Sequence, residues 1–404
     1  MLEEQLSQEY RTIVEQVTKV AREVAAPLAA TLDRENRFPS EMFEALQADR
    51  LTSLCVPEAQ GGYGLGPDGK DALPVWLSTR ALATVDSSSA HAFQVHTNTT
   101  HGVALLGTPE QHERFLRPVV EDGAVFGFWG SEQSGAPPDG GPRGYTMAHR
   151  VDGGWELTGK KFYSTNAGAT KYGVVFAYPD DVDKPLDHLM LFAVDCDSPG
   201  VHVRSEWWDA ATGMRSTASH QVDFDGVFVD DGAVIGSPGG YWKEQVQARY
   251  LPQFSSNFQG VGAHMFNDAM QYLTERGRTK NDFTLRYMAE ARVQLNAAEL
   301  MLGRAADLYR ERRMSEAYDA SRQVRAFSES AVRRVIELVQ ASCGSSFYLG
   351  QGGMERVLRD WQFYSRHENV DLILRAIGRS EFGMGGEGTA AAFGFGGGGG
   401  SQRD

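Results

Sequence analysis

Residues 159–166 read Gly-Lys-Lys-Phe-Tyr-Ser-Thr-Asn, and they lie within a region that consists of short runs of alternating apolar and polar residues. The runs extend from Val125–Trp129 to Val222–Val229, and turns such as Asp225-Gly226 separate them. A period of two residues and Asp-Gly turns are typical of β-strands joined by hairpins. The sequence therefore predicts a β-domain over residues 123–236.

Helical periodicity flanks this β-domain on both sides. Apolar residues recur at helical spacing in residues 1–122, and residues 237–384 contain four long helical stretches, the last of them Met354–Phe382. We expect an N-terminal helical domain, the β-domain and a C-terminal helical bundle, which is a mainly α member of the α+β class. Residues 385–404 contain a run of glycines without apolar periodicity, which predicts a disordered tail.

Composition narrows the class of protein. The 404 residues carry a formal net charge of -14, which disfavours nucleic acid or an anionic membrane as a partner. No apolar stretch approaches the length of a membrane span, and the acidic, amphipathic start lacks the features of a targeting signal, so we expect a cytoplasmic protein. The three cysteines are far apart and lack metal-ligand spacing, so no metal site is expected.

Five local motifs occur in order along the chain, and each of them alone is a weak signal. Together they resemble the acyl-CoA dehydrogenase superfamily over residues 6–383. The resemblance implies a β-domain of barrel or sandwich type, a C-terminal four-helix bundle, a bound flavin and a homotetramer. The motifs are Val56-Pro57-Glu58 with Gly61-Gly62-Tyr63-Gly64, Gly107–Gln111, Ser131–Gly135, Gly159–Asn166 and Gly213–Ser219.

The same resemblance implies where the flavin binds, between the β-domain and the C-terminal bundle. Short hydroxyl residues would bond to its polar edge or phosphate, and flat aromatic residues would cover its rings. For Arg215 two roles stay open, a contact to phosphate or the anchoring of a loop. The residues that would contact the cofactor are Trp129, Ser131, Ser134, Tyr163, Ser164, Thr165, Arg215 and Arg276.

Three details resemble the two-component flavin monooxygenases within this superfamily: Lys161-Phe162-Tyr163-Ser164, Arg359-Asp360 followed by His367, and His96 in Phe93–His96. Such enzymes receive reduced FMN or FAD from a separate flavin reductase. They form a C4a-hydroperoxide with oxygen and oxygenate a small aromatic, sulfur or amine substrate. The resemblance implies that His96, Ser164 and His367 stabilise or protonate the reacting groups, since imidazole exchanges protons near neutral pH.

Glu368 supports a different activity. It occupies the place of the base that removes the α-proton in FAD-dependent acyl-CoA dehydrogenases, although the flanking residues differ from that family pattern. A structural role is equally open, in which Glu368 forms a salt bridge to Arg366 or Arg375 or orients His367. A third hypothesis is a catalytically silent homologue that acts as a binding partner.

Overall fold

The computed structural model describes residues 2–132, 145–180, 182, 188–345, 349 and 353–384. Ser134 and the predicted disordered tail, 385–404, lie outside these residues. Within them, no helix is both long enough and apolar enough to cross a membrane.

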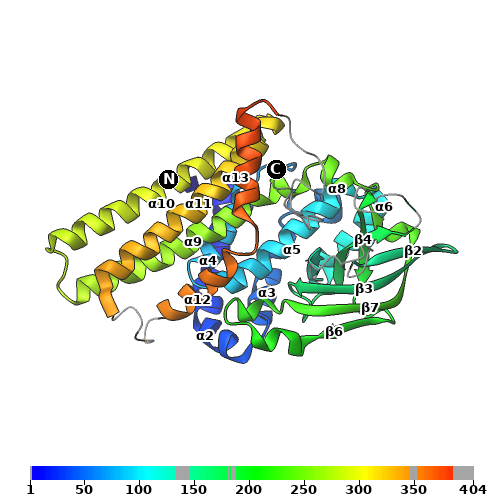
Figure 1. Cartoon of the computed structure of the whole chain (residues 1–404), viewed down its shortest axis with the longest axis horizontal. Helices are drawn as coiled ribbons and strands as arrows, with labels where there is room; N and C mark the ends of the chain where they lie inside the picture. Colours follow the sequence, from blue (N-terminus) through cyan, green and yellow to red (C-terminus); the bar gives the residue numbers. More distant parts are fainter. Residues whose placement is uncertain are drawn as a thin grey trace, which may run out of the picture.

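The first part of the chain is helical (Figure 1). Its central helix is α5, Ser87–Leu106, which is buried from Ser87 to Val103. Asp86 caps α5, because its side chain accepts the backbone N–H of Ser89. The other helices of this part are α1 (Gln8–Val20), α2 (Ala26–Glu35), α3 (Ser40–Ala48), α4 (Leu73–Ala83), α6 (Pro109–Gln111) and α7 (Arg117–Glu121).

Eight strands form the β-domain, in the order β6-β7-β3-β2-β4-β5-β8, and β1 pairs in parallel with β4. The motif Gly159–Asn166 spans the end of strand β3, where the register with β7 shifts between Lys161 and Ser164 and Tyr163 has a φ of 54°. The strands are β1 (Phe126–Trp129), β2 (Met147–Val151), β3 (Gly154–Ser164), β4 (Tyr172–Pro179), β5 (Met190–Asp195), β6 (Val201–Arg204), β7 (His220–Asp230) and β8 (Val234–Ile235).

Three long helices dominate the last part of the chain and pack along one another as an extended arm (Figure 1). They are α9 (Val246–Glu275), α10 (Asp282–Arg310) and α11 (Met314–Cys343), preceded by the short α8 (Gly240–Lys243). The shorter α12 (Met354–Tyr364) and α13 (Val370–Glu381) follow them.

The predicted continuous helix over Met354–Phe382 is wrong, because the chain leaves the helical path between α12 and α13. Asn369 caps α13 by accepting the backbone N–H of Asp371, and this cap starts a new helix. The mainly helical architecture with a central sheet is confirmed. The break between α12 and α13 matters for function, since His367 and Glu368 lie in it.

Candidate active site

A cavity of about 1230 Å³, its open mouth included, lies where the β-domain meets the helices. One wall comes from the ends of β1 and β3, a second from α5, and a third from α8 and the start of α9. The break between α12 and α13 and the first turns of α13 complete it. Apolar and aromatic side chains form most of the lining, as is usual for sites that bind small molecules.

The β-domain wall carries three of the predicted flavin contacts, Ser131, Tyr163 and Thr165. Tyr163 and Thr165 both line the cavity, whereas Ser164 between them does not. The hydroxyl that this stretch offers to the cavity is therefore that of Thr165. The Ser164 Oγ is buried and has no hydrogen-bond partner among the described residues.

The sequence predicted that the ring of Trp129 contacts the cofactor, but Trp129 does not line the cavity. Its side chain is fully buried, and its ring lies against Gly173, where a Cβ would come within 2.3 Å of it. The Trp129 Nε1–H donates a hydrogen bond to the Thr165 carbonyl oxygen at 3.1 Å. Trp129 therefore holds the backbone of Thr165 in place from behind the wall.

Opposite this wall lies Glu368, whose carboxylate is held at both oxygens. Its Oε2 accepts from the Arg325 Nε at 3.2 Å, and its Oε1 accepts from the Gln247 Nε2 at 3.3 Å. Arg325 is fully buried and also pairs with Glu329 at 3.0 Å. The salt bridge expected for Glu368 exists, but its partner is Arg325, which lies 43 residues earlier and which the sequence did not single out.

His367 lines the cavity, and its side chain is exposed there. Its ring lies 5.3 Å from the ring of His91 on α5, edge to face. Desolvation by the neighbouring protein lowers the pKa of His367, although the neighbouring Glu368 carboxylate opposes this shift. Burial also holds the pKa of His91 well below its usual value, and the proximity of His367 lowers it further. The two imidazoles are therefore not both in the charged, doubly protonated form at neutral pH.

A chain of hydrogen bonds links His91 to the β-domain. The Tyr364 hydroxyl donates to Gln94 at 2.8 Å, so it accepts from the His91 Nδ1–H, 2.9 Å away. The His91 Nε2 then faces the Thr165 Oγ1 at 3.4 Å. Thr165 is itself held by the Ser219 hydroxyl at 2.9 Å. This arrangement leaves the Nε2 of His91 as the atom that takes up a proton.

His96, the histidine that the sequence had singled out on this helix, is not part of this arrangement. Its Nε2–H donates to the Thr52 carbonyl oxygen at 2.9 Å, and its Nδ1 accepts from the Phe126 N–H at 3.1 Å. Burial lowers its pKa to about 4. Both ring nitrogens are thus occupied by backbone groups, which is a structural role and argues against the predicted catalytic one.

His91 is the residue that the motif comparison missed. It lies five residues before His96, a separation that turns the helix through about 500° and places the two rings on roughly opposite faces. Both fall within the helix that the sequence predicted. The spacing showed that they face different ways, but it did not show which of the two packs against His367.

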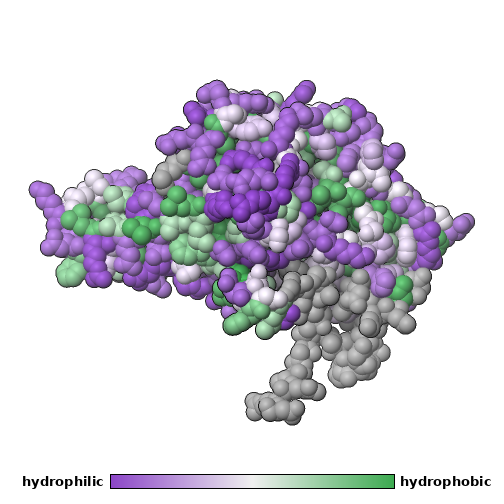
Figure 2. All heavy atoms as spheres, turned by 90° about the horizontal axis from the view of Figure 1, so that it is seen from above, coloured by the Kyte–Doolittle hydropathy of each residue, from purple (hydrophilic) through white to green (hydrophobic). Residues whose placement is uncertain are grey.

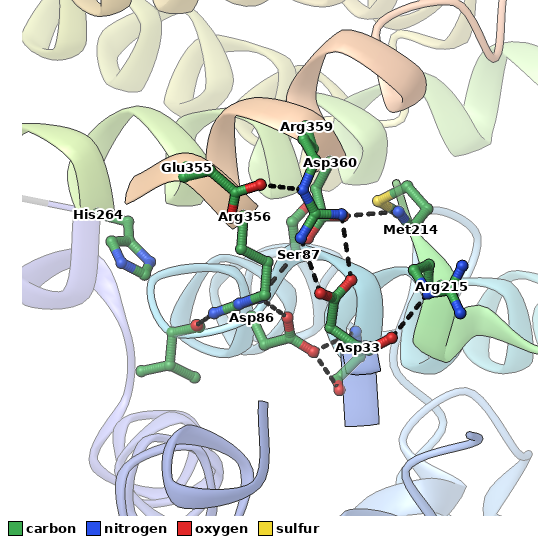
Figure 3. A network of polar contacts seen from close by, with 12 residues as sticks. Asp33, Asp86, Ser87, Met214, Arg215, His264, Glu355, Arg356, Arg359 and Asp360 are labelled. Carbon is green, nitrogen blue, oxygen red and sulfur yellow. Dashed lines mark hydrogen bonds and ion pairs between the residues drawn. The ribbon is translucent and has the colours of Figure 1, made fainter. Parts of the chain in front are cut away.

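Two predicted cofactor contacts lie elsewhere. Arg215 donates to three backbone carbonyl oxygens, those of Asp33 at 2.7 Å, Ala211 at 2.8 Å and Asp209 at 3.2 Å, so it anchors a loop (Figure 3). Arg276 is exposed at the end of α9 and lies over the ring of Tyr272. Neither side chain reaches the cavity in this chain.

A buried polar network fixes α12, and with it the break that carries His367 (Figure 3). Arg356 pairs with Asp86, the cap of α5. Arg359 pairs with Asp33 of α2 at 2.8 Å, and Asp360 accepts the backbone N–H of Met214 at 2.6 Å.

Burial raises the pKa of Asp360 to about 7. Two motifs from the sequence, Gly213–Ser219 and Arg359-Asp360, therefore meet in space at this contact.

Family models cover most of the chain. The N-terminal, middle and C-terminal domain models of acyl-CoA dehydrogenase match residues 7–122, 128–227 and 255–372. The chain belongs to the acyl-CoA dehydrogenase family. Members of this family are flavin-dependent oxidoreductases.

The relatives include both dehydrogenases and monooxygenases. Probable acyl-CoA dehydrogenase FadE25 of Mycobacterium tuberculosis is 24% identical over 92% of this chain and 95% of its own. Dibenzothiophene monooxygenase of Mycolicibacterium goodii is 29% identical over 72% of each chain. The crystal structure of dibenzothiophene monooxygenase TdsC from Paenibacillus sp. A11-2 shares the fold, with a TM-score of 0.82 and 18% identity over 94% of this chain and 99% of TdsC.

Proposed function

We propose that this protein is a flavin-dependent monooxygenase that uses reduced flavin and oxygen to oxygenate a small aromatic, sulfur or amine substrate. The observation that carries the proposal is a pair of imidazoles, in which His367 lines the cavity and His91 lies behind it, 3.4 Å from the Thr165 Oγ1. The carboxylate of Glu368, in contrast, is held by Arg325 and Gln247. Among the groups described, the cavity thus offers the imidazole of His367 for proton transfer, but no free carboxylate base.

The described residues fit a flavin. The cavity combines the hydroxyl groups of Ser131 and Thr165 on the β-domain with flat aromatic side chains such as Tyr163 and Tyr241. TdsC has been solved with FMN and indole bound. When bound, a reduced flavin would supply the two electrons that activate oxygen. We propose that it arrives as reduced FMN or FAD from a separate reductase.

The protein's own contribution would be to handle protons in a site with little water. The His91 Nε2 is able to take or give a proton next to Thr165, and His367 faces the cavity beside it. Because desolvation lowers the pKa of both rings, each returns a proton readily to a reacting oxygen. The aromatic walls keep bulk water away from the reacting groups.

The alternative is an FAD-dependent acyl-CoA dehydrogenase with Glu368 as the base. The position of Glu368 at the cavity and the similarity to FadE25 favour it. However, a general base must be free to approach the proton that it removes, whereas both oxygens of Glu368 accept hydrogen bonds from protein groups. We therefore rank it second.

We also propose that the protein assembles as a homotetramer. The outer face of α10 exposes large apolar side chains, Val293 at 63% and Leu300 at 62%, and Leu285 continues this row. Figure 2 shows hydrophobic side chains along the helical arm between hydrophilic ones. Exposed apolar rows of this kind are typical of surfaces that pack against another subunit.

The function can be tested by oxygen incorporation. The anaerobic protein is mixed with chemically reduced FMN or FAD and a panel of aromatic, sulfur and amine compounds, and ¹⁸O₂ is then admitted. Mass spectrometry should detect one labelled oxygen atom in a product. Heat-denatured protein with the same reduced flavin controls for free-solution chemistry. If no compound is oxygenated and acyl-CoAs instead bleach a bound FAD, the alternative is correct.

A further inference from the structure

One face of helix α5 runs from His91, which lies behind His367, along the wall of the cavity. Residues 91, 95, 98 and 102 are spaced by three or four positions, so they form a single stripe along the helix. Val95 and Asn98 line the cavity. With a rise of 1.5 Å per residue, Asn98 lies about 10 Å along the helix axis from His91. The stripe therefore joins the histidine pair to a second, more distant part of the same cavity.

Asn98 is polar, buried and unpaired. The residue is only 8% exposed, and the described residues form no hydrogen bond with its amide. The polar atoms of this amide are not among the fully buried ones, so they reach the open space of the cavity. A carboxamide offers two donors and a carbonyl acceptor to a molecule bound there. This side chain is thus available for a bound molecule.

A second unpaired group lies close to the same stripe. A Cβ at Gly102 would be 2.4 Å from the Tyr250 Oη, so the hydroxyl rests against α5 one turn beyond Asn98. The Tyr250 Oη is buried and has no hydrogen-bond partner within the described ranges. Tyr250 also lines the cavity. Two polar groups without partners therefore lie near one end of an otherwise mostly apolar pocket.

The charged groups at the cavity are already compensated within the protein. Glu368 is held by Arg325, and Arg322 is held by Asp319 at 3.1 Å and by Gln245 at 2.9 Å. An ionised substrate would lose its hydration here without gaining a free counter-ion among these groups. A neutral molecule does not meet this cost.

We propose that Asn98 and Tyr250 select neutral ring compounds with one hydrogen-bonding group, such as a hydroxyl or a ring N–H. That group binds at the Asn98 end, and the ring lies along α5 toward His91 and His367. The inference rests on the proposed function, because it treats the cavity as the substrate site. It narrows the broad class of aromatic, sulfur or amine substrates to neutral ring molecules with a polar end.

Direct binding of three probes of similar shape tests this proposal. They are 2-naphthol, which carries a neutral hydroxyl, 2-methylnaphthalene, which lacks it, and 2-naphthoate, which carries a charge. Isothermal titration calorimetry on the full-length protein should give about tenfold tighter binding of 2-naphthol than of the other two. Tenfold corresponds to one hydrogen bond of about 1.4 kcal/mol.

The variant Asn98→Leu keeps the side-chain size but removes the hydrogen-bonding groups. It should reduce the preference for 2-naphthol over 2-methylnaphthalene to less than threefold, while 2-methylnaphthalene binds as before. Tyr250→Phe should reduce the same ratio by a smaller factor. Unchanged binding of 2-methylnaphthalene also serves as the control for correct folding.

Two outcomes would overturn the proposal: a wild-type protein that shows no preference for 2-naphthol, or a preference that survives in Asn98→Leu. Failure of all three probes to bind would overturn it as well. Because the assay measures binding without oxygen or flavin turnover, its result is independent of the oxygenation test. If the binding preference depends on Asn98 but no compound is oxygenated, the proposed function is rejected and the selection by Asn98 stands.

Discussion

Helix α5 carries three buried histidines, His91, His96 and His101, and the first two lie in contrasting environments. The ring of His96 is held between two backbone groups, the Thr52 carbonyl and the Phe126 N–H, with no nitrogen left over. The ring of His91 contacts side chains that titrate or rotate, namely His367, Tyr364 and Thr165. His91 and His96 are the same type of residue and are both buried, so their hydrogen-bond partners decide their roles. Backbone partners make a structural histidine, and side-chain partners at a cavity make a candidate for proton transfer.

The largest expected effect is a loss in the rate of oxygenation when His367 or His91 is replaced. His367→Asn and His91→Asn should each lower the rate of oxygenation by about 100-fold or more, since proton transfer by a placed side chain contributes factors of this size. Steady-state rates with reduced flavin in excess measure the loss. His264→Asn is the control, because His264 pairs with Asp268 and does not line the cavity. Equal rates in all three variants would remove the histidine pair from the mechanism.

His96 lies on the other face of α5, and His96→Ala should lower the free energy of unfolding. The change removes the partners of two buried backbone groups and leaves a void, which together cost roughly 4 kcal/mol. Chemical denaturation measures the free energy of unfolding. The rate per folded molecule should stay within about threefold of wild type. A rate loss as large as that of His367→Asn, without a loss of stability, would return His96 to the active site.

The pH dependence of the free energy of unfolding tests the structural role of His96. The pKa of His96 is lowered to about 4 in the folded protein, so the unfolded chain binds a proton first as the pH falls. The contribution of His96 is complete above pH 6.5 and is lost progressively toward pH 4. Between pH 7.5 and pH 5 the loss is about 2 kcal/mol.

His96→Gln should lack this part of the acid sensitivity, as denaturation at the two pH values would show. The lowered pKa values of His91 and His367 act in the same direction, and they remain in that variant. An identical loss of stability in His96→Gln and wild type would contradict the assignment.

The smallest effect is expected at Glu368. Because Arg325 and Gln247 hold this carboxylate, Glu368→Gln should lower oxygenation by less than tenfold. Glu329→Gln is matched to it, since Glu329 pairs with the same Arg325 but does not line the cavity. If Glu368→Gln alone abolishes activity, and acyl-CoAs bleach a bound flavin only in the wild type, Glu368 is the base of a dehydrogenase.

Much of the fold could be predicted from the chain. The change from helical to strand period near residue 123, and back near residue 237, predicted the order of the layers, since each period reflects which side of an element is buried. The break between α12 and α13 was not predicted. Apolar residues continue at helical spacing across Met354–Phe382, and the cap at Asn369 is a single side-chain contact.

The element order, the family resemblance and the positions of Tyr163, Thr165 and His367 follow from the sequence. Which face of α5 packs against His367 depends on the tertiary structure, which places His91 there and holds His96 between backbone groups. The physical reason is distance along the chain. Helical period fixes the angles between side chains on one helix, whereas the role of each face depends on neighbours such as Tyr364, which contacts His91 across 273 residues.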